Sequence, residues 1–310
     1  MAQKIAVIVP TIRPESWKLF LEAWEPLFKK HEVFLFKVDD SEENPTVTVF
    51  DYAENGNQID KFGYFHFEWL FNKTDGCRNL GFYRAYEFRV NRFIQIEIFI
   101  TLDDDVYPHN NDPIQEHLDA LNMSVSPSWM STAQDWRVRG IPVGGEKWPV
   151  MLSHGVWAGV PDFDAPTQLL NPDVRDIAFN RTNVPVGVLF PVCIMNVAFR
   201  RELLPWMYQA PMGKRLAEFD LPVGDRFADI WSGIIAKKAC DANQWGVVTG
   251  YSTIYHSRAS NVFANLRKEA IFMELNETFA NEFYNPETSN EYVLLYRAKL
   301  AEWQSAIAAI

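Results

Sequence analysis

The chain has 310 residues, of which 48% are hydrophobic and 22% charged, so it has the composition of a globular protein rather than a disordered or fibrous one. Its formal net charge of −11 argues against a nucleic-acid partner, because duplex binding needs a basic face that displaces counterions. The three cysteines form no C-x-x-C pair, which indicates neither a zinc knuckle nor a disulfide framework.

The first hundred residues alternate between strand and helix patterns. Residues 5–9 are a continuous apolar run suited to a buried strand, and residues 33–38 form a second such run. Between them, residues 15–30 carry an apolar stripe at helical spacing. After a more polar stretch, we expect a helix over residues 77–90 and a strand over 96–102. This alternation predicts a doubly wound, mostly parallel sheet.

The second half of the chain has a less regular pattern. Asp112 followed by Pro113 is a typical helix start, which predicts a helix to residue 121. Residues 123–190 are rich in Pro, Gly, Trp and Asp, and we expect a loop-rich, functional segment there. The remaining predicted elements are strands at 192–199 and 246–249, a turn at Gly250, and helices at 225–242, 262–283 and 287–309.

These elements predict a single α/β domain over about residues 1–270, followed by a helical C-terminal tail over about 271–310. The apolar run near the N-terminus is too short for a signal peptide, and no stretch approaches the length of a membrane span. Because the cysteines show no disulfide pattern, a reducing compartment is the simplest expectation, and we predict a cytoplasmic location.

Three consecutive aspartates, Asp103 to Asp105, follow the predicted strand 96–102. Side chains alternate along an extended chain, so Asp103 and Asp105 are expected to point one way and Asp104 the other. Two carboxylates on the same side can share a divalent cation, and that cation can neutralise a diphosphate. The alternative is a solvated acidic turn or a helix-capping cluster.

Other polar residues are predicted at the same edge of the sheet. Thr11, Arg13 and Asp39 follow the first two strands, and ligands of doubly wound sheets bind beyond the carboxyl ends of the strands. Asp39, at the tip of the second strand, is suited to accept a hydrogen bond from a ligand at that edge. Arg78 begins a predicted helix, where a diphosphate would gain from the guanidinium and from free backbone amides. The alternative for Arg78 is a solvent-facing arginine.

Two strings in the second half of the chain are distinctive, residues 152–157 (Leu-Ser-His-Gly-Val-Trp) and 160–169 (Val-Pro-Asp-Phe-Asp-Ala-Pro-Thr-Gln-Leu). They closely resemble one family, the reversibly glycosylated polypeptides, which are the UDP-arabinopyranose mutases of plants and their microbial relatives. The resemblance spans roughly residues 5 to 270. Its further motifs are 10–13, Cys77-Arg78 with Gly81, the aspartate triplet, 138–142, 189–196, 229–231 and 256–261.

The resemblance implies a GT-A-like fold and a UDP-sugar bound through a divalent metal. It implies that the triplet contacts metal and ribose, with Asp103 and Asp105 as metal ligands and Asp104 as a substrate contact. We expect His256 to join the metal, because neutral imidazole suits Mn²⁺, although carboxylate oxygens accept Mg²⁺ as well. The alternative for His256 is a histidine hydrogen-bonded to nearby backbone.

The long motifs also supply candidate substrate contacts. His154 is expected to be structural or to contact the substrate. Trp157 and Trp231 are candidates for stacking on the sugar, although buried tryptophans are more often core residues. Asp164, in the second long motif, is a further candidate substrate contact.

Arg139 matches the arginine that becomes glycosylated in the family. A guanidinium stays protonated and is a poor nucleophile, so a covalent role requires a carboxylate partner. The candidates are Asp135, Glu146 and, more distant in sequence, Asp229. Plant members carry a second arginine seven positions after the first, where this chain has Glu146. Glu146 reverses the charge at this position, so the sugar or the reaction could differ from that of the plant members. The expectation of UDP-sugar binding depends less on this position than the expectation of mutase activity does.

Three functions remain open on the sequence. The first is a metal-dependent mutase that interconverts UDP-arabinopyranose and UDP-arabinofuranose. The second is a glycosyltransferase that uses the same donor site on an acceptor. The third is a non-catalytic UDP-sugar-binding subunit of a homo- or hetero-oligomer.

Overall fold

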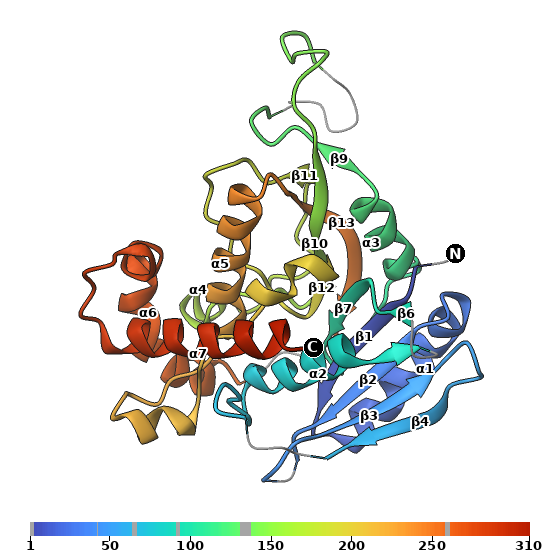
Figure 1. Cartoon of the computed structure of the whole chain (residues 1–310), viewed down its shortest axis with the longest axis horizontal. Helices are drawn as coiled ribbons and strands as arrows, with labels where there is room; N and C mark the ends of the chain where they lie inside the picture. Colours follow the sequence, from blue (N-terminus) through green and yellow to red (C-terminus); the bar gives the residue numbers. More distant parts are fainter. Residues whose placement is uncertain (1–2, 42, 64–66, 91–93, 131–137, 258–260) are drawn as a thin grey trace.

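The structure is a computed structural model that describes residues 3–41, 43–63, 67–90, 94–130, 138–257 and 261–310 (Figure 1). Its strands are β1 (Ile5–Thr11), β2 (Phe34–Asp39), β3 (Thr46–Asp51), β4 (Asn57–Phe62), β5 (Arg89–Val90), β6 (Ile94–Gln95), β7 (Ile98–Leu102), β8 (Val106–Pro108), β9 (Ser124–Val125), β10 (Trp148–Gly159), β11 (Thr182–Asn183), β12 (Asn196–Arg200) and β13 (Gly246–His256). Its α-helices are α1 (Pro14–Lys30), α2 (Arg78–Glu87), α3 (Pro113–Leu121), α4 (Ala165–Leu170), α5 (Ala228–Ala242), α6 (Val262–Tyr284) and α7 (Glu291–Ala308). The 3₁₀ turns are η1 (Asp75–Cys77), η2 (Arg201–Trp206) and η3 (Lys214–Phe219).

One eleven-stranded sheet runs through the described residues in the order β11-β13-β10-β12-β7-β1-β2-β3-β4, with β8 on β13 and β9 on β10. Strand β12 pairs antiparallel with both β7 and β10, so β2, β1, β7, β10 and β13 all point the same way. Their carboxyl ends therefore lie at one edge. The predicted α/β fold with a mostly parallel sheet is confirmed, and it is consistent with a GT-A-like fold.

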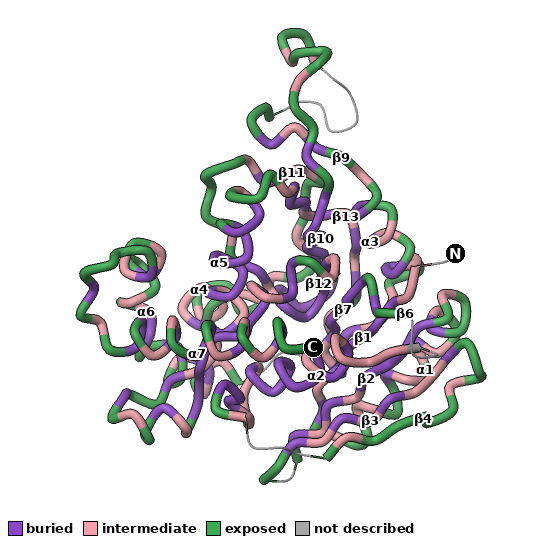
Figure 2. The backbone as a smooth tube through the Cα atoms, viewed as in Figure 1, coloured by how far each residue is buried: buried purple, intermediate pink, exposed green. Residues whose placement is uncertain are grey.

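Helices cover both faces of this sheet, as a doubly wound fold requires. On β1, Ile5, Val7 and Val9 face the core that contains α1, while Ala6 and Ile8 face the core that contains α2. Helix α2 lies close to the sheet at Gly81, where an added Cβ would come 2.6 Å from Ile8 and 2.7 Å from Val38. Both faces are therefore buried, and Figure 2 shows the central strands as buried and the edge strand β4 as exposed.

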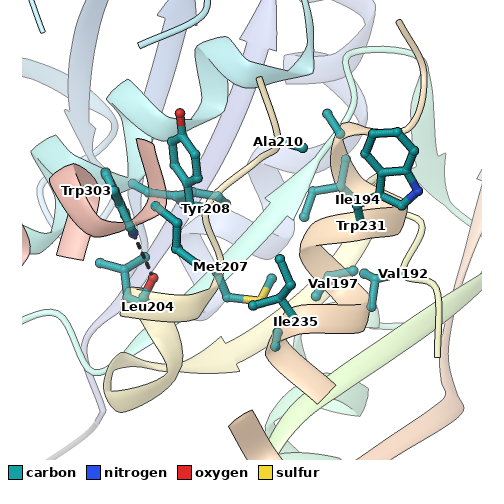
Figure 3. Close-up of a cluster of buried hydrophobic side chains, with 14 of the residues drawn as sticks. Val192, Ile194, Val197, Leu204, Met207, Tyr208, Ala210, Trp231, Ile235 and Trp303 are labelled. Atoms are coloured by element: carbon teal, nitrogen blue, oxygen red, sulfur yellow. Dashed lines mark hydrogen bonds between the residues drawn. The ribbon is translucent and has the colours of Figure 1, made fainter. Parts of the chain in front are cut away.

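The C-terminal helices are part of this core rather than an appended tail. Trp303 of α7 is fully buried and donates from Nε1 to the Leu204 carbonyl at 3.3 Å (Figure 3). Trp231 of α5 stacks on Phe279 of α6, with ring centroids 4.5 Å apart. The predicted helices 262–283 and 287–309 are confirmed, the second beginning four residues later than expected.

The expectation of loops over residues 123–190 is wrong at its centre. Strand β10 occupies Trp148–Gly159 and pairs with both β12 and β13, in the middle of the sheet. Nine of its twelve residues are buried, including the polar Ser153 and His154. A strand buried on both faces shows no alternation of apolar and polar residues, so the usual strand signal was absent.

Two further strand predictions also need correction. Strand β13 does not end at residue 249 but continues to His256, because the positive φ of Gly250 (84°) falls within the strand, where the register with β10 shifts. Glycine adopts such backbone without steric cost, and a bulge therefore resembles a turn in sequence. In the polar stretch after residue 40, β3 and β4 form an antiparallel extension of the sheet.

The described helices include none long and apolar enough to cross a membrane.

Candidate functional site

A cavity of about 750 Å³ opens at the carboxyl ends of the same-direction strands, at the edge predicted for ligand binding. Its size lies in the range of small-molecule sites in proteins. Among the predicted residues, those in its wall are Arg13, Asp103, Asp105, His154, Trp157, Asp164, Asp229 and His256. Residues from β7, β10, β13 and α6 meet there, so the cavity joins segments from most of the chain.

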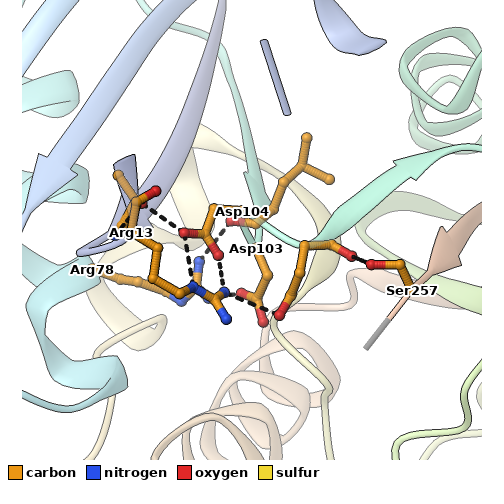
Figure 4. A network of polar contacts seen from close by, with 8 residues as sticks. Arg13, Arg78, Asp103, Asp104 and Ser257 are labelled. Atoms are coloured by element: carbon orange, nitrogen blue, oxygen red, sulfur yellow. Dashed lines mark hydrogen bonds and ion pairs between the residues drawn. The ribbon is translucent and has the colours of Figure 1, made fainter. Parts of the chain in front are cut away.

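The aspartate triplet alternates as predicted. Asp103 and Asp105 line the cavity, whereas Asp104 is buried and accepts a hydrogen bond from Thr11 Oγ1 at 2.6 Å. Arg13 contacts Asp104 and also reaches Asp105, with 3.0 Å between Nη2 and Oδ2 (Figure 4). Thr11 and Asp104 therefore act behind the wall, where they fix Arg13 and the tip of β7.

Arg78 lies under Asp103 rather than in the cavity wall. Its side chain is 1% exposed, donates to Thr101 Oγ1 at 2.8 Å and to the Leu102 carbonyl at 3.0 Å, and contacts Asp103. Burial lowers the pKa of Arg78, but Asp103 and Asp75 outweigh burial and raise it. The guanidinium thus positions Asp103, and its direct contact with a diphosphate stays a prediction.

The three predicted metal ligands line one part of the cavity. His256 donates from Nδ1 to the Val160 carbonyl at 2.8 Å, which leaves Nε2 unprotonated in the neutral ring. Burial and the Asp103 carboxylate raise the pKa of Asp105, so these two carboxylates repel each other and a cation would relieve the repulsion. Within the described residues, no group of three or more His, Cys, Asp or Glu side chains is close enough to form a ready-made metal site.

His154 is held as a neutral, structural histidine at the cavity wall. Its Nε2 accepts the Cys193 backbone N–H at 3.2 Å, so Nδ1 carries the proton and donates to Thr249 Oγ1 at 2.9 Å. Burial, followed by the effect of His117, lowers the pKa of His154 to about 3. Beside it, Trp157 packs edge-on against Phe179, with centroids 5.1 Å apart.

The cavity wall also contains charged residues that the sequence analysis did not select. These are Asp75, Asp162, Arg226, Glu269 and Glu277. Asp162 lies two residues before Asp164 in the second long motif and was the available signal, while Glu269 sits in an ordinary helix pattern. Asp229 accepts the Ile194 N–H at 3.0 Å, and burial with the nearby Asp75 raises its pKa to about 8.

Four predicted residues remain to be placed. Asp164 caps α4 by accepting the Thr167 N–H at 2.9 Å, and it is exposed at the cavity rim. Asp39 is outside the wall, and its carboxylate accepts hydrogen bonds from Ser41 and from Lys37, which lower its pKa despite partial burial. Arg139 and Glu146 are exposed and do not line the cavity.

Comparison with known proteins identifies the family. The model of the reversibly glycosylated polypeptides matches residues 1–294. The chain belongs to the reversibly glycosylated polypeptide family. A probable UDP-arabinopyranose mutase 1 from Pisum sativum is 34% identical over 289 residues, covering 87% of this chain and 74% of that relative. UDP-arabinopyranose mutase 3 from Arabidopsis thaliana is 33% identical over 288 residues, with the same two coverages.

In this member of the family, the segment with Arg139 is attached at the end of β10 remote from the cavity. Residues 138–147 project beyond β9 at the top of Figure 1 and enter β10 at Trp148. Trp157, in the cavity wall, lies nine residues further along β10, roughly 30 Å away at about 3.3 Å per residue. Asp135, a candidate partner of Arg139, lies outside the described residues.

Proposed function

We propose that this protein is a metal-dependent mutase that interconverts UDP-arabinopyranose and UDP-arabinofuranose. The observation that carries the proposal is the pair of carboxylates, Asp103 and Asp105, that share one side of the strand end in a cavity of about 750 Å³. The relatives named UDP-arabinopyranose mutase support the substrate and the reaction, since they match most of this chain.

In this proposal the metal site uses Asp103, Asp105 and the free Nε2 of His256. Because no three His, Cys, Asp or Glu side chains of the described residues are grouped closely enough to hold a metal, oxygen atoms of the substrate diphosphate would have to supply part of the coordination. Bound there, Mn²⁺ or Mg²⁺ supplies charge that neutralises the diphosphate as it leaves the sugar. The imidazole favours Mn²⁺ over Mg²⁺.

The remaining residues divide between the nucleotide and the sugar. Arg13, fixed by Thr11 and Asp104, faces the diphosphate side of the cavity. Asp39, next to Thr11 in the β1–β2 register, is proposed to accept from the uracil imide. The sugar then lies against the further wall residues His154, Trp157 and Asp164.

Ring exchange requires a proton to move between two sugar oxygens. After the bond between C1 and the diphosphate oxygen breaks, with its electron pair going to UDP, the C1–O5 bond must open and a C1–O4 bond must form. Asp229 is suited to this step because its pKa of about 8 leaves it protonated at neutral pH. As O4 attacks C1 and the C1–O5 bond breaks, Asp229 gives its proton to O5 and takes up the proton of the 4-hydroxyl, so C1 keeps one ring oxygen throughout, and UDP then attacks C1.

Arg139 and Glu146, assigned to catalysis from the sequence, have no contact with this cavity in the described structure. The family resemblance remains the support for a role of Arg139. The three unpaired cysteines fit a reducing compartment, and we place the reaction in the cytoplasm.

The deciding experiment incubates the purified protein with UDP-arabinopyranose and Mn²⁺ and separates the products by chromatography. UDP-arabinofuranose is the expected product. Release of UDP only when an acceptor is added would instead indicate a glycosyltransferase, and binding without turnover would indicate a UDP-sugar-binding subunit.

A further inference from the structure

Besides the aspartate triplet, the cavity wall presents an arginine beside an aspartate. Arg226 precedes α5, and Asp162 lies between β10 and α4, yet Arg226 Nη2 and Asp162 Oδ1 are 3.7 Å apart. Both line the cavity, and their side chains are 31% and 29% exposed. A separation of 3.7 Å is too long for a hydrogen bond, so the donor and the acceptor lie side by side without satisfying each other.

Both side chains are held in place from behind. Glu269 of α6 is 4% exposed and accepts from Arg226 Nε at 2.8 Å, while its other oxygen accepts the Ala165 N–H at 2.7 Å. Asp162 Oδ2 accepts the Cys193 thiol at 3.0 Å. One buried carboxylate therefore joins Arg226 to the start of α4, directly after the segment that carries Asp162.

The backbone of Arg226 shows that this position is imposed by its surroundings. Its φ of +75° lies in the left-handed region, which is costly for a residue with a side chain. The Asp225 carboxylate accepts the Arg226 N–H at 2.9 Å and pairs with Lys268 Nζ at 3.2 Å. Such a conformation persists only where the surrounding structure holds the residue in place.

Some polar atoms of Arg226 and Asp162 have no hydrogen-bond partner in the described part of the chain and are available to a ligand. Within the described residues, Arg226 Nη1 and Nη2 donate no hydrogen bond, and Asp162 Oδ1 accepts none. A guanidinium donor beside a carboxylate acceptor matches two neighbouring hydroxyl groups, one of which accepts while the other donates. Neither a phosphate nor an apolar group satisfies both.

Asp75 relates this pair to the other half of the cavity. Its pKa is raised to about 6 by burial, and its charge interacts with Arg78 and Asp103 and also with Asp225 and Arg226. Asp75 is therefore near both the aspartate triplet and the Arg226–Asp162 pair in the same cavity wall. A nucleotide sugar with its diphosphate at the triplet would place its sugar towards the pair.

We propose that Asp162 and Arg226 determine sugar specificity by binding two adjacent hydroxyls of the UDP-linked pentose, with Glu269 as the positioning residue. This inference rests on the proposed function, because it takes a UDP-sugar as the ligand.

The test compares the binding of UDP and of UDP-arabinopyranose by calorimetry, with Mn²⁺ present, in wild type, Asp162→Asn and Arg226→Lys. We expect both variants to bind UDP within twofold of wild type and UDP-arabinopyranose at least tenfold more weakly, the loss typical of a hydrogen bond to a charged group. Asp173→Asn and Arg175→Lys are matched controls, since both residues are exposed and outside the cavity. They should bind both ligands like wild type.

Equal binding of UDP-arabinopyranose by the variants and wild type would overturn the inference alone, as would a parallel loss of UDP binding. If wild type binds neither UDP nor the UDP-sugar, the proposed function fails instead. Monodeoxy analogues of UDP-arabinopyranose provide a test on wild type that needs no folded variant. Two neighbouring deoxy positions should each weaken binding at least tenfold, and a loss at no position or at separated positions would contradict the pair.

Discussion

At the scale of single residues, the site depends on carboxyl groups that differ in their partners. Asp104 forms an ion pair with Arg13 and accepts a hydrogen bond from Thr11, and these contacts hold its carboxylate in place. Asp103 and Asp105 face the cavity, where their mutual repulsion favours a cation. Asp229 is held where burial and Asp75 disfavour its charged form. Three chemical roles thus arise from one residue type through differences in environment.

The metal prediction concerns Asp103 and Asp105. We expect UDP to bind at least tenfold more weakly when a chelator removes Mn²⁺, because the diphosphate then faces the Asp103 and Asp105 carboxylates without the charge of the cation. Asp103→Ala combined with Asp105→Ala should weaken UDP binding in Mn²⁺ and abolish its sensitivity to the chelator. Calorimetry with Mn²⁺ and with the chelator measures both effects. If neither the chelator nor the double substitution changes UDP binding, the proposed metal site is wrong.

The second prediction concerns the titration of Asp229. Its pKa is raised from 3.8 to about 8 in the folded protein, so between these values the folded state holds a proton that the unfolded chain has lost. The free energy of unfolding contributed by this group therefore falls as pH rises from about 4 to about 8. Asp229→Asn removes the titration, so the variant should gain stability relative to wild type between pH 5 and pH 8.

Urea unfolding of both proteins at pH 5, 6.5 and 8 measures this difference. Asp173→Asn, an exposed substitution outside the cavity, serves as the control and should keep a constant offset from wild type. A constant offset for Asp229→Asn as well would mean that Asp229 titrates normally.

At the scale of elements, β10 connects the segment that carries Arg139 to the cavity wall. Its far end carries His154 and Trp157 into the cavity wall, while its near end continues from the exposed segment 138–147. Arg139 and the cavity residues of β10 are therefore separated by most of the strand, although they are close in sequence. This separation determines which effects on exchange and on UDP binding we expect when Arg139 is replaced.

We expect Arg139→Ala to abolish pyranose–furanose exchange, as the resemblance implies, and to leave UDP affinity within twofold of wild type, because Arg139 is outside the cavity. Product chromatography and calorimetry on the same sample separate the two effects. Arg175→Lys, exposed and outside the cavity, is the control. Undiminished exchange would remove Arg139 from the mechanism, and a large loss of UDP binding would show that the segment closes on the nucleotide.

The elements that could be predicted from sequence are those with one-sided or uniformly apolar patterns. Helix α1 shows this well, since Phe20, Trp24 and Phe28 recur every four residues and are all buried. Strand β10 could not be predicted, because its buried polar residues Ser153 and His154 are hydrogen-bonded to His117 and Thr249. These partners are distant in sequence, so no local pattern indicates them. Strand β13 was divided in two by Gly250, whose left-handed backbone marks a bulge.

The same contrast holds for the site. The alternation of Asp103, Asp104 and Asp105 is a local property of an extended chain and was predictable. The roles of Arg226 and Glu269 could not be predicted, because the two residues are 43 positions apart in sequence and come into contact only in the folded protein. Likewise, the burial of Arg78 beneath Asp103 depends on the packing of α2 against the sheet.

At the scale of the whole molecule, the C-terminal helices stabilise the sheet and complete the cavity. Helix α6 brings Glu269, Met273, Asn276 and Glu277 to the wall, and Asn276 also accepts from Trp231 Nε1 at 2.9 Å. Helix α7 packs Tyr292, Tyr296 and Trp303 into the same core. Removal of core contacts in α7 should therefore affect the entire fold.

We expect Trp303→Ala to lower the free energy of unfolding by about 3–5 kcal/mol, the usual cost of deleting a fully buried tryptophan. Leu294→Ala, on the same helix but 45% exposed, should cost less than about 0.5 kcal/mol. Urea unfolding of the two variants checks the contrast. Similar, small losses would show that α7 is only loosely attached.

The contact between the tip of β7 and the end of β13 has a consequence for biosynthesis. Ser257 donates from its backbone and its hydroxyl to the Asp105 carbonyl, although 152 positions separate the two residues. A nascent chain exposes the aspartates long before His256, Ser257 or Glu269 has left the ribosome. Capture of nucleotide by a growing polypeptide must therefore wait until translation has passed Glu269, so ligand retention would report that α6 has joined the cavity.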